Sequence, residues 1–346
     1  MANPHDRGFN TVQNSRVAKR EQTTLLQKYT LLGVAGMAVL AVAILVVMAV
    51  GGIVDAMGPS TGRPDSEKPD WSTFTVTASD TLRGDLVLVN ATHAYTFPET
   101  EDHLAAMNDK RISHSPRIYQ QSGLSTYMDS TALDALDRML VDFNATTGKD
   151  DVTLRYAYRS AADQQELIDK GSASVPVGHS DHHTGLGIQL GYYRDARTYA
   201  LSTDPVYNWL FENCHTYGFV IRYPDNKTAE TGVEDYNEYF RYVGVAHATY
   251  MKENDLCMEE YVELLKGYSA EKPLGIKAVD GKYYEVYYVA VDGSATVKYP
   301  TNYAYSVSGT NEGGVVITVD RSKALTSEAD TAADTTADTT ADTAAG

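Results

Sequence analysis

Residues 178–185 read Gly-His-Ser-Asp-His-His-Thr-Gly, and this short stretch holds three of the nine histidines in the chain. Its two adjacent histidines, His182 and His183, are expected to point to different sides of the backbone, so only one of them can serve a given site. A metal ion in a protein needs three or four converging ligands. The stretch alone therefore predicts a polar loop, and its interpretation depends on the residues around it.

Several short motifs stand on either side of this stretch. In chain order they are Tyr158-Arg159-Ser160, Gln164, Trp209-Leu210-x-Glu212-Asn213, Tyr217-Gly218-Phe219-x-x-Arg222-Tyr223-Pro224, Thr231-Gly232 and Phe240-Arg241-Tyr242-Val243-Gly244. In this order and spacing they resemble the VanY-type D-alanyl-D-alanine carboxypeptidases over residues 80–265. The resemblance implies an α+β fold shared with hedgehog signalling domains. It also implies a zinc enzyme that removes the terminal D-alanine from peptidoglycan stem peptides.

The zinc-binding pattern of that family is only partly present. Its first motif is Ser-x-His, then six residues, then Asp; Ser180 and His182 match, and Gln189 stands in the Asp position. Its second motif is Glu-x-x-His just before the Phe-Arg-Tyr-Val-Gly segment. Here Tyr236 stands in the position of the Glu base and Tyr239 in that of the His ligand. The resemblance thus carries over His182 as the one retained metal ligand.

All three replacements change the chemistry in the same direction. The Gln189 amide is neutral and a poor zinc ligand, whereas a carboxylate offsets part of the metal charge. Tyr236 and Tyr239 are phenols with an ordinary pKa of about 10. A zinc peptidase needs a base that works near neutral pH. We therefore predict a domain that lacks the zinc mechanism and needs no cofactor, with Tyr236 inactive as a base.

Two alternatives stay open at this point. The first is an active metallo-D,D-carboxypeptidase with a non-standard zinc site built on His182. The second is a structural scaffold or adhesion ectodomain in which the old cleft has no role. Function has to be argued from the site rather than from the fold, so the sequence alone does not decide among them.

Substrate-side positions of the family are retained at Arg159, Gln164 and Ser180. Arginine holds a carboxylate by two parallel hydrogen bonds, so Arg159 is the predicted anchor for a peptide carboxylate. An equally open interpretation is that these residues only hold the loop and the helix start. The predicted partner is a peptidoglycan stem peptide or a cell-envelope protein. Arg222 and Arg241 are predicted to be buried or semi-buried ion-pair partners.

Charge is distributed unevenly along the chain. The 346 residues carry a net charge of −17, which excludes nucleic acid as a partner. Residues 1–28 hold five basic and two acidic side chains, or +3, which leaves −20 for the rest. Tyr29–Val54 carries no charge and at about 1.5 Å per residue is long enough to cross a bilayer. The positive-inside rule then predicts a single-pass membrane protein with a cytoplasmic N-terminus and an extracytoplasmic C-terminal part.

Changes of composition, helix caps and turn residues divide the chain into parts. The expected parts are a basic cytoplasmic tail (1–28), a transmembrane helix (29–54), a linker (55–73), a carboxypeptidase-like domain (74–268), a small β domain (274–320) and a disordered tail (321–346). Helix starts are expected near Ser130, with Thr131 and Asp134 as a capping box, at Ser160 with Asp163, and at Asp204-Pro205. Gly218 is expected to end the third helix. Asp280-Gly281 and Asp292-Gly293 predict hairpin turns.

Overall fold

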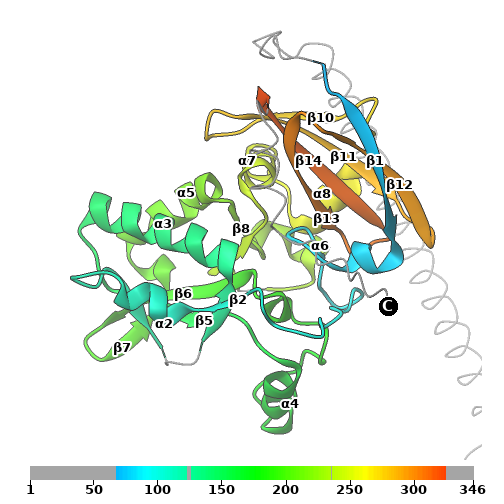
Figure 1. Cartoon of the computed structure of the whole chain (residues 1–346). Helices are drawn as coiled ribbons and strands as arrows, with labels where there is room; N and C mark the ends of the chain where they lie inside the picture. Colours follow the sequence, from blue (N-terminus) through cyan, green and yellow to red (C-terminus); the bar gives the residue numbers. More distant parts are fainter. Residues whose placement is uncertain (1–67, 123–125, 235, 325–346) are drawn as a thin grey trace, which may run out of the picture. The chain divides into compact units, whose positions relative to one another are not determined.

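The structure is a computed structural model that describes residues 68–122, 126–234 and 236–324. Its α+β body is built around a central mixed sheet (Figure 1). The sheet has the order β3-β5-β6-β9-β8, with β7 paired to β6. β3 is parallel to β5, and the other pairs are antiparallel. These strands are β3 (Gln120–Gln121), β5 (Val152–Tyr156), β6 (Gly187–Arg194), β7 (Arg197–Tyr199), β8 (Phe219–Ile221) and β9 (Tyr239–Tyr242).

Helices and two short strands surround this sheet. A two-stranded pair joins β2 (Leu104–Ala106) to β4 (Tyr127–Asp129). The α-helices are α2 (Met107–Ile112), α3 (Ser130–Thr147), α4 (Ala161–Asp169), α5 (Asn208–Asn213), α6 (Thr228–Thr231), α7 (Val245–Glu253) and α8 (Met258–Leu265). The 3-10 turns are η1 (Ala78–Leu82), η2 (Asp181–Thr184), η3 (Leu201–Thr203), η4 (Pro205–Tyr207), η5 (Cys214–Tyr217) and η6 (Asp225–Lys227).

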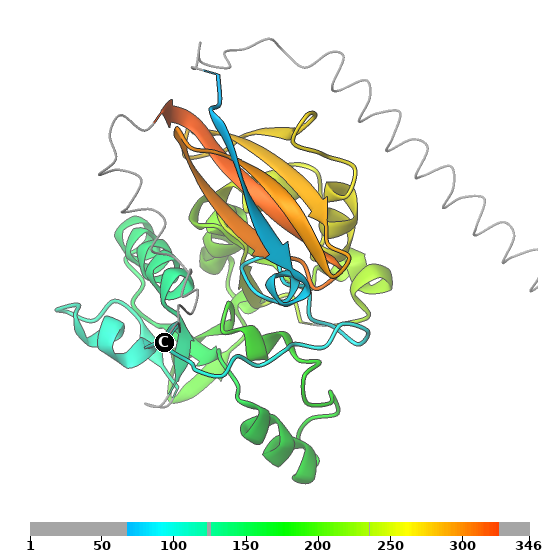
Figure 2. The ribbon, with the colours of Figure 1, turned by 45° about the vertical axis from the view of Figure 1, so that its right-hand side comes forward.

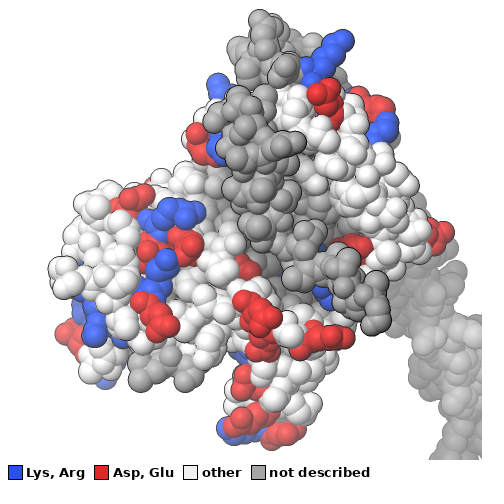
Figure 3. Space-filling model, viewed as in Figure 1, with Lys and Arg blue, Asp and Glu red and all other residues white. Residues whose placement is uncertain are grey.

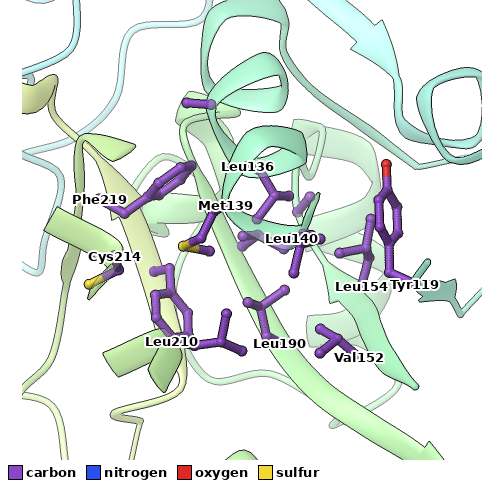
Figure 4. Packing of buried hydrophobic residues seen from close by; sticks show 14 of the residues in the cluster. Tyr119, Leu136, Met139, Leu140, Val152, Leu154, Leu190, Leu210, Cys214 and Phe219 are labelled. Atoms are coloured by element: carbon purple, nitrogen blue, oxygen red, sulfur yellow. The ribbon is translucent and has the colours of Figure 1, made fainter. Parts of the chain in front are cut away.

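The core of the body lies between α3 and the sheet. Leu136, Met139 and Leu140 recur at helical spacing and form the buried face of α3. Figure 4 shows them against Leu154 of β5 and Leu190 of β6. Burial of this face stabilises the helix far more than the intrinsic preferences of its residues do. This packing fixes β6, one of the two strands that carry the candidate site.

Most of the predicted helix boundaries are confirmed. Ser160 and Asp163 form the expected capping box on α4. Asp204 caps the turn that begins with Pro205, and Gly218 ends the run with a left-handed φ of 86°. That run is not one α-helix but the series η4, α5 and η5. At α3 the predicted cap is wrong, because Asp129 rather than Thr131 accepts the first N–H groups of the helix.

A second sheet region includes a strand from before the body. The four-stranded sheet β10-β11-β14-β13 is accompanied by the pair β1-β12. The strands are β1 (Trp71–Thr77), β10 (Leu274–Lys277), β11 (Tyr283–Ala290), β12 (Ser294–Pro300), β13 (Tyr303–Gly309) and β14 (Gly314–Ala324). We call these six strands the β unit. Gly281 and Gly293 take positive φ angles of 83° and 69° in its turns, as their sequence context predicts.

The limits of the β unit differ from the expected ones. Residues 71–73 are not linker and residues 74–77 are not part of the body, because the whole of β1 pairs with β12 from Trp71–Pro300 to Thr77–Ser294. Figure 2 shows β1 beside the late strands of the chain. At the other end β14 extends to Ala324, which pairs with Tyr303, so residues 321–324 are strand and not tail. Strand partners are chosen by tertiary packing, which local sequence does not reveal.

The β unit and the body share buried side chains. Met258, Tyr261 and Leu265 of α8 belong to one apolar cluster with Val286 and Val316 of the β unit. The boundary expected between residues 268 and 274 is therefore a change of secondary structure within one packed unit.

A buried histidine also bridges the two parts. This residue is His247 of α7. Its Nδ1 lies 2.7 Å from the Tyr261 hydroxyl, and its Nε2 lies 2.9 Å from the Thr318 hydroxyl. Burial lowers the pKa of His247 from its ordinary 6.5 to about 4. A neutral imidazole supplies one donor and one acceptor, so the two hydroxyls satisfy it fully.

No helix within the described ranges is long and apolar enough to cross a membrane. The predicted basic tail 1–28, the predicted span Tyr29–Val54 and residues 325–346 lie outside those ranges.

Stability should fall as the pH drops, because of His247. Its folded pKa of about 4 lies below the unfolded value of 6.5, so the unfolded chain binds the proton more readily. This contribution is complete above pH 6.5 and is lost towards pH 4, by up to about 3 kcal/mol. We expect His247→Gln to flatten the difference in unfolding free energy between pH 7.5 and pH 4.5, measured by urea titration. Thr198→Ala, which changes an exposed residue that carries no titrating group, should leave that difference unchanged; equal flattening by both variants would contradict the assignment.

Candidate functional site

The candidate site lies where β6 and β9 run side by side. Gln189 of β6 is directly opposite Tyr239 of β9, so both side chains leave the same face of the sheet. Tyr236 precedes β9 in a turn closed by the Tyr239 N–H and the Tyr236 carbonyl at 3.3 Å. His182 reaches the same place from η2. The structure thus brings together the four residues that occupy the family's metal and base positions.

His182 keeps the orientation of a metal ligand, but a tyrosine takes its free nitrogen. Its Nδ1 lies 2.8 Å from the Ala157 carbonyl oxygen, so Nδ1 carries the proton and donates. Nε2 must then be the acceptor, and the Tyr236 hydroxyl lies 3.1 Å from it. A backbone carbonyl on Nδ1 is how metal-binding histidines are commonly held. Here the lone pair that would face a metal meets the Tyr236 hydroxyl instead, whose single proton also has Gln189 Oε1 within reach at 3.4 Å.

His183 has a purely structural role. Its Nδ1 donates to the Arg159 carbonyl oxygen at 2.6 Å and its Nε2 accepts from the Gly178 N–H at 3.2 Å. Both ring nitrogens are therefore used inside the protein. As the sequence predicts, only one of the two adjacent histidines faces the site.

Three tyrosine rings pack together beside His182. Tyr236 and Tyr239 are stacked with ring centres 5.3 Å apart, and Tyr223 lies 5.8 Å from each. The His182 ring meets the Tyr239 ring edge-on at 4.7 Å. Tyr239 is fully buried, and its hydroxyl has no hydrogen-bond partner among the described residues. Aromatic packing fills the space in which the family pattern places ligands.

Gly187 provides the room for Tyr239. A methyl group at Gly187 would lie 2.2 Å from the Tyr239 hydroxyl oxygen and 2.4 Å from its ring carbon Cζ. Contacts that short cannot exist without movement, and the ring is held by its packing against His182, Tyr223 and Tyr236. The tyrosine in the ligand position and the glycine two residues before Gln189 therefore depend on each other.

The titrating groups of the site are neutral near pH 7. Burial and the charge of Arg159 lower the pKa of His182 to about 3. Burial raises the pKa of Tyr236 to about 12, with Arg159 opposing it, and raises that of Tyr239 well above 10. An imidazole, an amide and two phenols therefore offer no negative charge to a metal ion.

A group of four charged side chains, three of them buried, lies behind the site. Asp181, next to His182, accepts a hydrogen bond from Arg241 Nη1 and forms an ion pair with Arg222 Nε at 3.6 Å. Arg222 also holds Glu259 by two bonds of 2.7 and 2.9 Å. Burial opposes ionisation of Glu259, but Arg222 keeps its pKa below the ordinary value. Arg222 and Arg241 are fully buried, so the predicted ion-pair role of both is confirmed.

Arg159 and Ser180 lie next to His182, and Gln164 is bonded to Arg159. The Arg159 N–H donates to the His182 carbonyl oxygen at 3.1 Å. Its guanidinium Nη1 donates to Gln164 Oε1 at 2.8 Å, and the Gln164 amide donates to the Val175 carbonyl at 2.6 Å. Gln164 is fully buried, whereas Arg159 is half-buried. Ser180 is buried at the start of η2. Whether these residues bind a substrate stays a prediction.

A cavity of about 260 Å³ adjoins the tyrosines on the side of η3 and η6. It is lined by Gln189, Ala200, Ser202, Asp225, Tyr236, Asn237 and Glu238. No motif in the sequence singles out Ser202 or Asn237. The turn before β9 directs the side chains of Glu238 and Tyr236 to one cavity. No local sequence motif predicts this arrangement.

Comparisons with known proteins agree with this fold. A family model described as "VanY: D-alanyl-D-alanine carboxypeptidase" matches residues 125–245. A D-alanyl-D-alanine carboxypeptidase of Enterococcus faecium is 30% identical over 249 residues, which is 71% of this chain and 78% of the relative. The bifunctional D-Ala-D-Ala dipeptidase and carboxypeptidase VanXYC of Enterococcus gallinarum is 28% identical over 205 residues, covering 52% and 94%.

A solved structure shares the fold. The vancomycin-resistance D,D-dipeptidase VanXYg, in complex with a D-Ala-D-Ala phosphinate analogue, matches with a TM-score of 0.62 and 23% identity, over 72% of this chain and 99% of that one. The fold is thus that of a D,D-peptidase. The chain belongs to the VanY D-alanyl-D-alanine carboxypeptidase family, as its motifs predict.

The zinc that the family resemblance implies does not fit these side chains. A zinc site of this kind needs nitrogen and carboxylate or thiolate ligands at about 2.0–2.3 Å. His182 is the one strong donor, its Nε2 is occupied, and Gln189 and Tyr239 add neutral groups. Within residues 68–122, 126–234 and 236–324 no three His, Cys, Asp or Glu side chains gather to hold a metal.

The pairing of Gly187 with Tyr239 predicts a non-additive double substitution. We expect Gly187→Ala alone to destabilise the chain by about 1–3 kcal/mol, because the new methyl overlaps the phenol. In Gly187→Ala with Tyr239→Ala the overlap is gone, so the glycine change should add almost nothing. Urea unfolding measures both. Gly267→Ala, where a methyl meets the nearest atom at 3.4 Å, is the control; additive effects would show that the two residues are independent.

The buried charges predict a large loss of stability for Asp181→Asn. The amide keeps the shape but removes the charge shared by two buried guanidinium groups, which should cost about 3–5 kcal/mol. Thermal or urea unfolding provides the measurement. Glu166→Gln breaks an exposed ion pair with Lys170 and should change stability by less than about 1 kcal/mol. A loss as small as that of the control would disprove the assigned role.

Proposed function

We propose that this chain is a membrane-anchored, extracytoplasmic protein that binds peptidoglycan stem peptides in a D-alanyl-D-alanine carboxypeptidase fold without hydrolysing them. The observation that carries the proposal is the hydrogen bond of 3.1 Å from the Tyr236 hydroxyl to His182 Nε2. It occupies the nitrogen that would bind zinc and places a phenol where the family has its base. Relatives named as D-Ala-D-Ala peptidases support this class of ligand.

Arg159 is the residue that would hold the peptide carboxylate. Within the described chain its side chain makes one hydrogen bond, from Nη1 to Gln164, which leaves Nη2 and Nε for a ligand. Because Gln164 is itself tied to the Val175 carbonyl, the guanidinium is oriented before the ligand arrives. A preoriented arginine loses less side-chain entropy on binding than a mobile lysine would.

Membrane anchoring rests on the sequence. The uncharged segment Tyr29–Val54 follows a basic stretch, and the remainder of the chain is strongly acidic. A protein with this arrangement keeps its folded part on the outer side of the membrane, where stem peptides are found. Protease accessibility in intact cells and in permeabilised cells tests the orientation.

The binding proposal predicts a defined role for Arg159. Full-length protein in detergent should bind the pentapeptide L-Ala-γ-D-Glu-L-Lys-D-Ala-D-Ala in a calorimetric titration, and Arg159→Ala should weaken binding about tenfold or more. Arg197→Ala removes an exposed arginine on β7 and should leave the affinity unchanged. The wild type should release no D-alanine from this peptide and should hold less than stoichiometric zinc by elemental analysis.

Other results would decide for the alternatives. D-alanine release that a chelator abolishes, or stoichiometric zinc that is lost in His182→Ala, would establish an active metallo-carboxypeptidase. No measurable peptide affinity in the wild type would leave a structural role for the ectodomain.

A further inference from the structure

The cavity beside Tyr236 contains a buried carboxylate without a cation. Glu238 is 7% exposed and lines the cavity. Its Oε1 accepts two hydrogen bonds from Ser202, one from the N–H at 3.1 Å and one from the hydroxyl at 3.0 Å. Among the described residues Glu238 has no ion-pair partner, and its Oε2 has no hydrogen bond. Burying a carboxylate is unfavourable unless a cation or further donors compensate it.

The remaining lining of the cavity has the same character. Asp225 contributes a second carboxylate, whose Oδ2 accepts from the Asn237 amide at 3.1 Å. Gln189, Ser202 and Asn237 add neutral polar groups, and no lysine or arginine is present. With a volume of about 260 Å³ the cavity is too small for a drug-sized ligand but accepts an unbranched alkyl chain with a polar end.

The geometry points to this cavity as a subsite for a primary ammonium group of the ligand, with Glu238 as the charged partner. Its position fits a second contact point for a peptide, since Gln189 and Tyr236 belong both to the cavity and to the candidate site. A peptide with a lysine-type side chain can then place a carboxylate at Arg159 and an amine at Glu238. For a peptide ligand the inference rests on the proposed function, and it names the side chain that gives selectivity.

The test compares two peptides that differ in one group. The pentapeptide with L-Lys and its analogue with norleucine have side chains of similar length, and only the first carries an ammonium group. In calorimetric titrations of full-length protein we expect the lysine peptide to bind about tenfold or more tightly than the analogue. Glu238→Gln should remove this preference and keep an acceptor for the Ser202 N–H. Glu234→Gln, which neutralises an exposed neighbour outside the cavity, should keep it.

The outcomes separate this inference from the proposed function. Equal binding of both peptides to the wild type, or a lysine preference that survives in Glu238→Gln, overturns the ammonium subsite and leaves peptide binding intact. If neither peptide binds, the proposed function fails, and 1,5-diaminopentane becomes the probe. Saturation-transfer NMR signals from this diamine that Glu238→Gln abolishes support the subsite, and their absence in the wild type overturns it.

Discussion

The arrangement of the site depends on a group of four charges, three of them buried and the fourth, Glu259, partly buried. Arg222 directly after β8, Arg241 of β9, Asp181 of η2 and Glu259 of α8 balance one another, and all but Glu259 are fully buried. Arg241 also donates to the carbonyl oxygens of Asp85 and Val87, so residues 85–87 are tied to the same group. Because an unpaired charge would be so costly there, none of these elements can shift alone. Asp181 holds the turn that carries His182, which explains how the histidine keeps its orientation although Gln189 and Tyr239 stand in the other two ligand positions of the family.

Next to this charged group, Tyr223, Tyr236 and Tyr239 form a second set of residues that depend on one another. A zinc centre is held by charge and by coordination, whereas this site is held by ring stacking, burial and neutral hydrogen bonds. Tyr239 requires the space left by Gly187, and Tyr236 requires the acceptor nitrogen of His182. Raised phenol pKa values follow from the same burial that makes the packing favourable. A tyrosine at position 239 without a glycine at 187 would overlap its neighbour, and a tyrosine at 236 without His182 would lack this acceptor for its hydroxyl. The residues of this set are therefore compatible with one another as a group.

Sequence reasoning reached the fold and the site where local chemistry or motif spacing determines them. The Ser160–Asp163 and Asp204–Pro205 signals mark real helix starts, and the spacing around His182 correctly brings Gln189, Tyr236 and Tyr239 to one place. The predictions were wrong or missing where residues far apart in the sequence determine the structure. Thr131 and Asp129 are both competent caps, and only the path of the chain selects Asp129. The partner of β1 lies at the far end of the sequence, and the Glu238–Ser202 contact spans 36 positions. No periodicity of hydrophobic residues encodes such choices.

The pairing of β1 with β12 also has a consequence for the order of folding. The Asp70 N–H, next to the first strand, donates to Asn302, 232 positions later. A chain synthesised from its N-terminus must therefore hold this early strand without its partner until almost the entire body has been made. Closing so long a loop is entropically costly and slow. The β1–β12 pair can consequently form only after residues 294–300 have been made, and a product truncated before residue 294 would expose an unpaired strand edge that can associate with other chains.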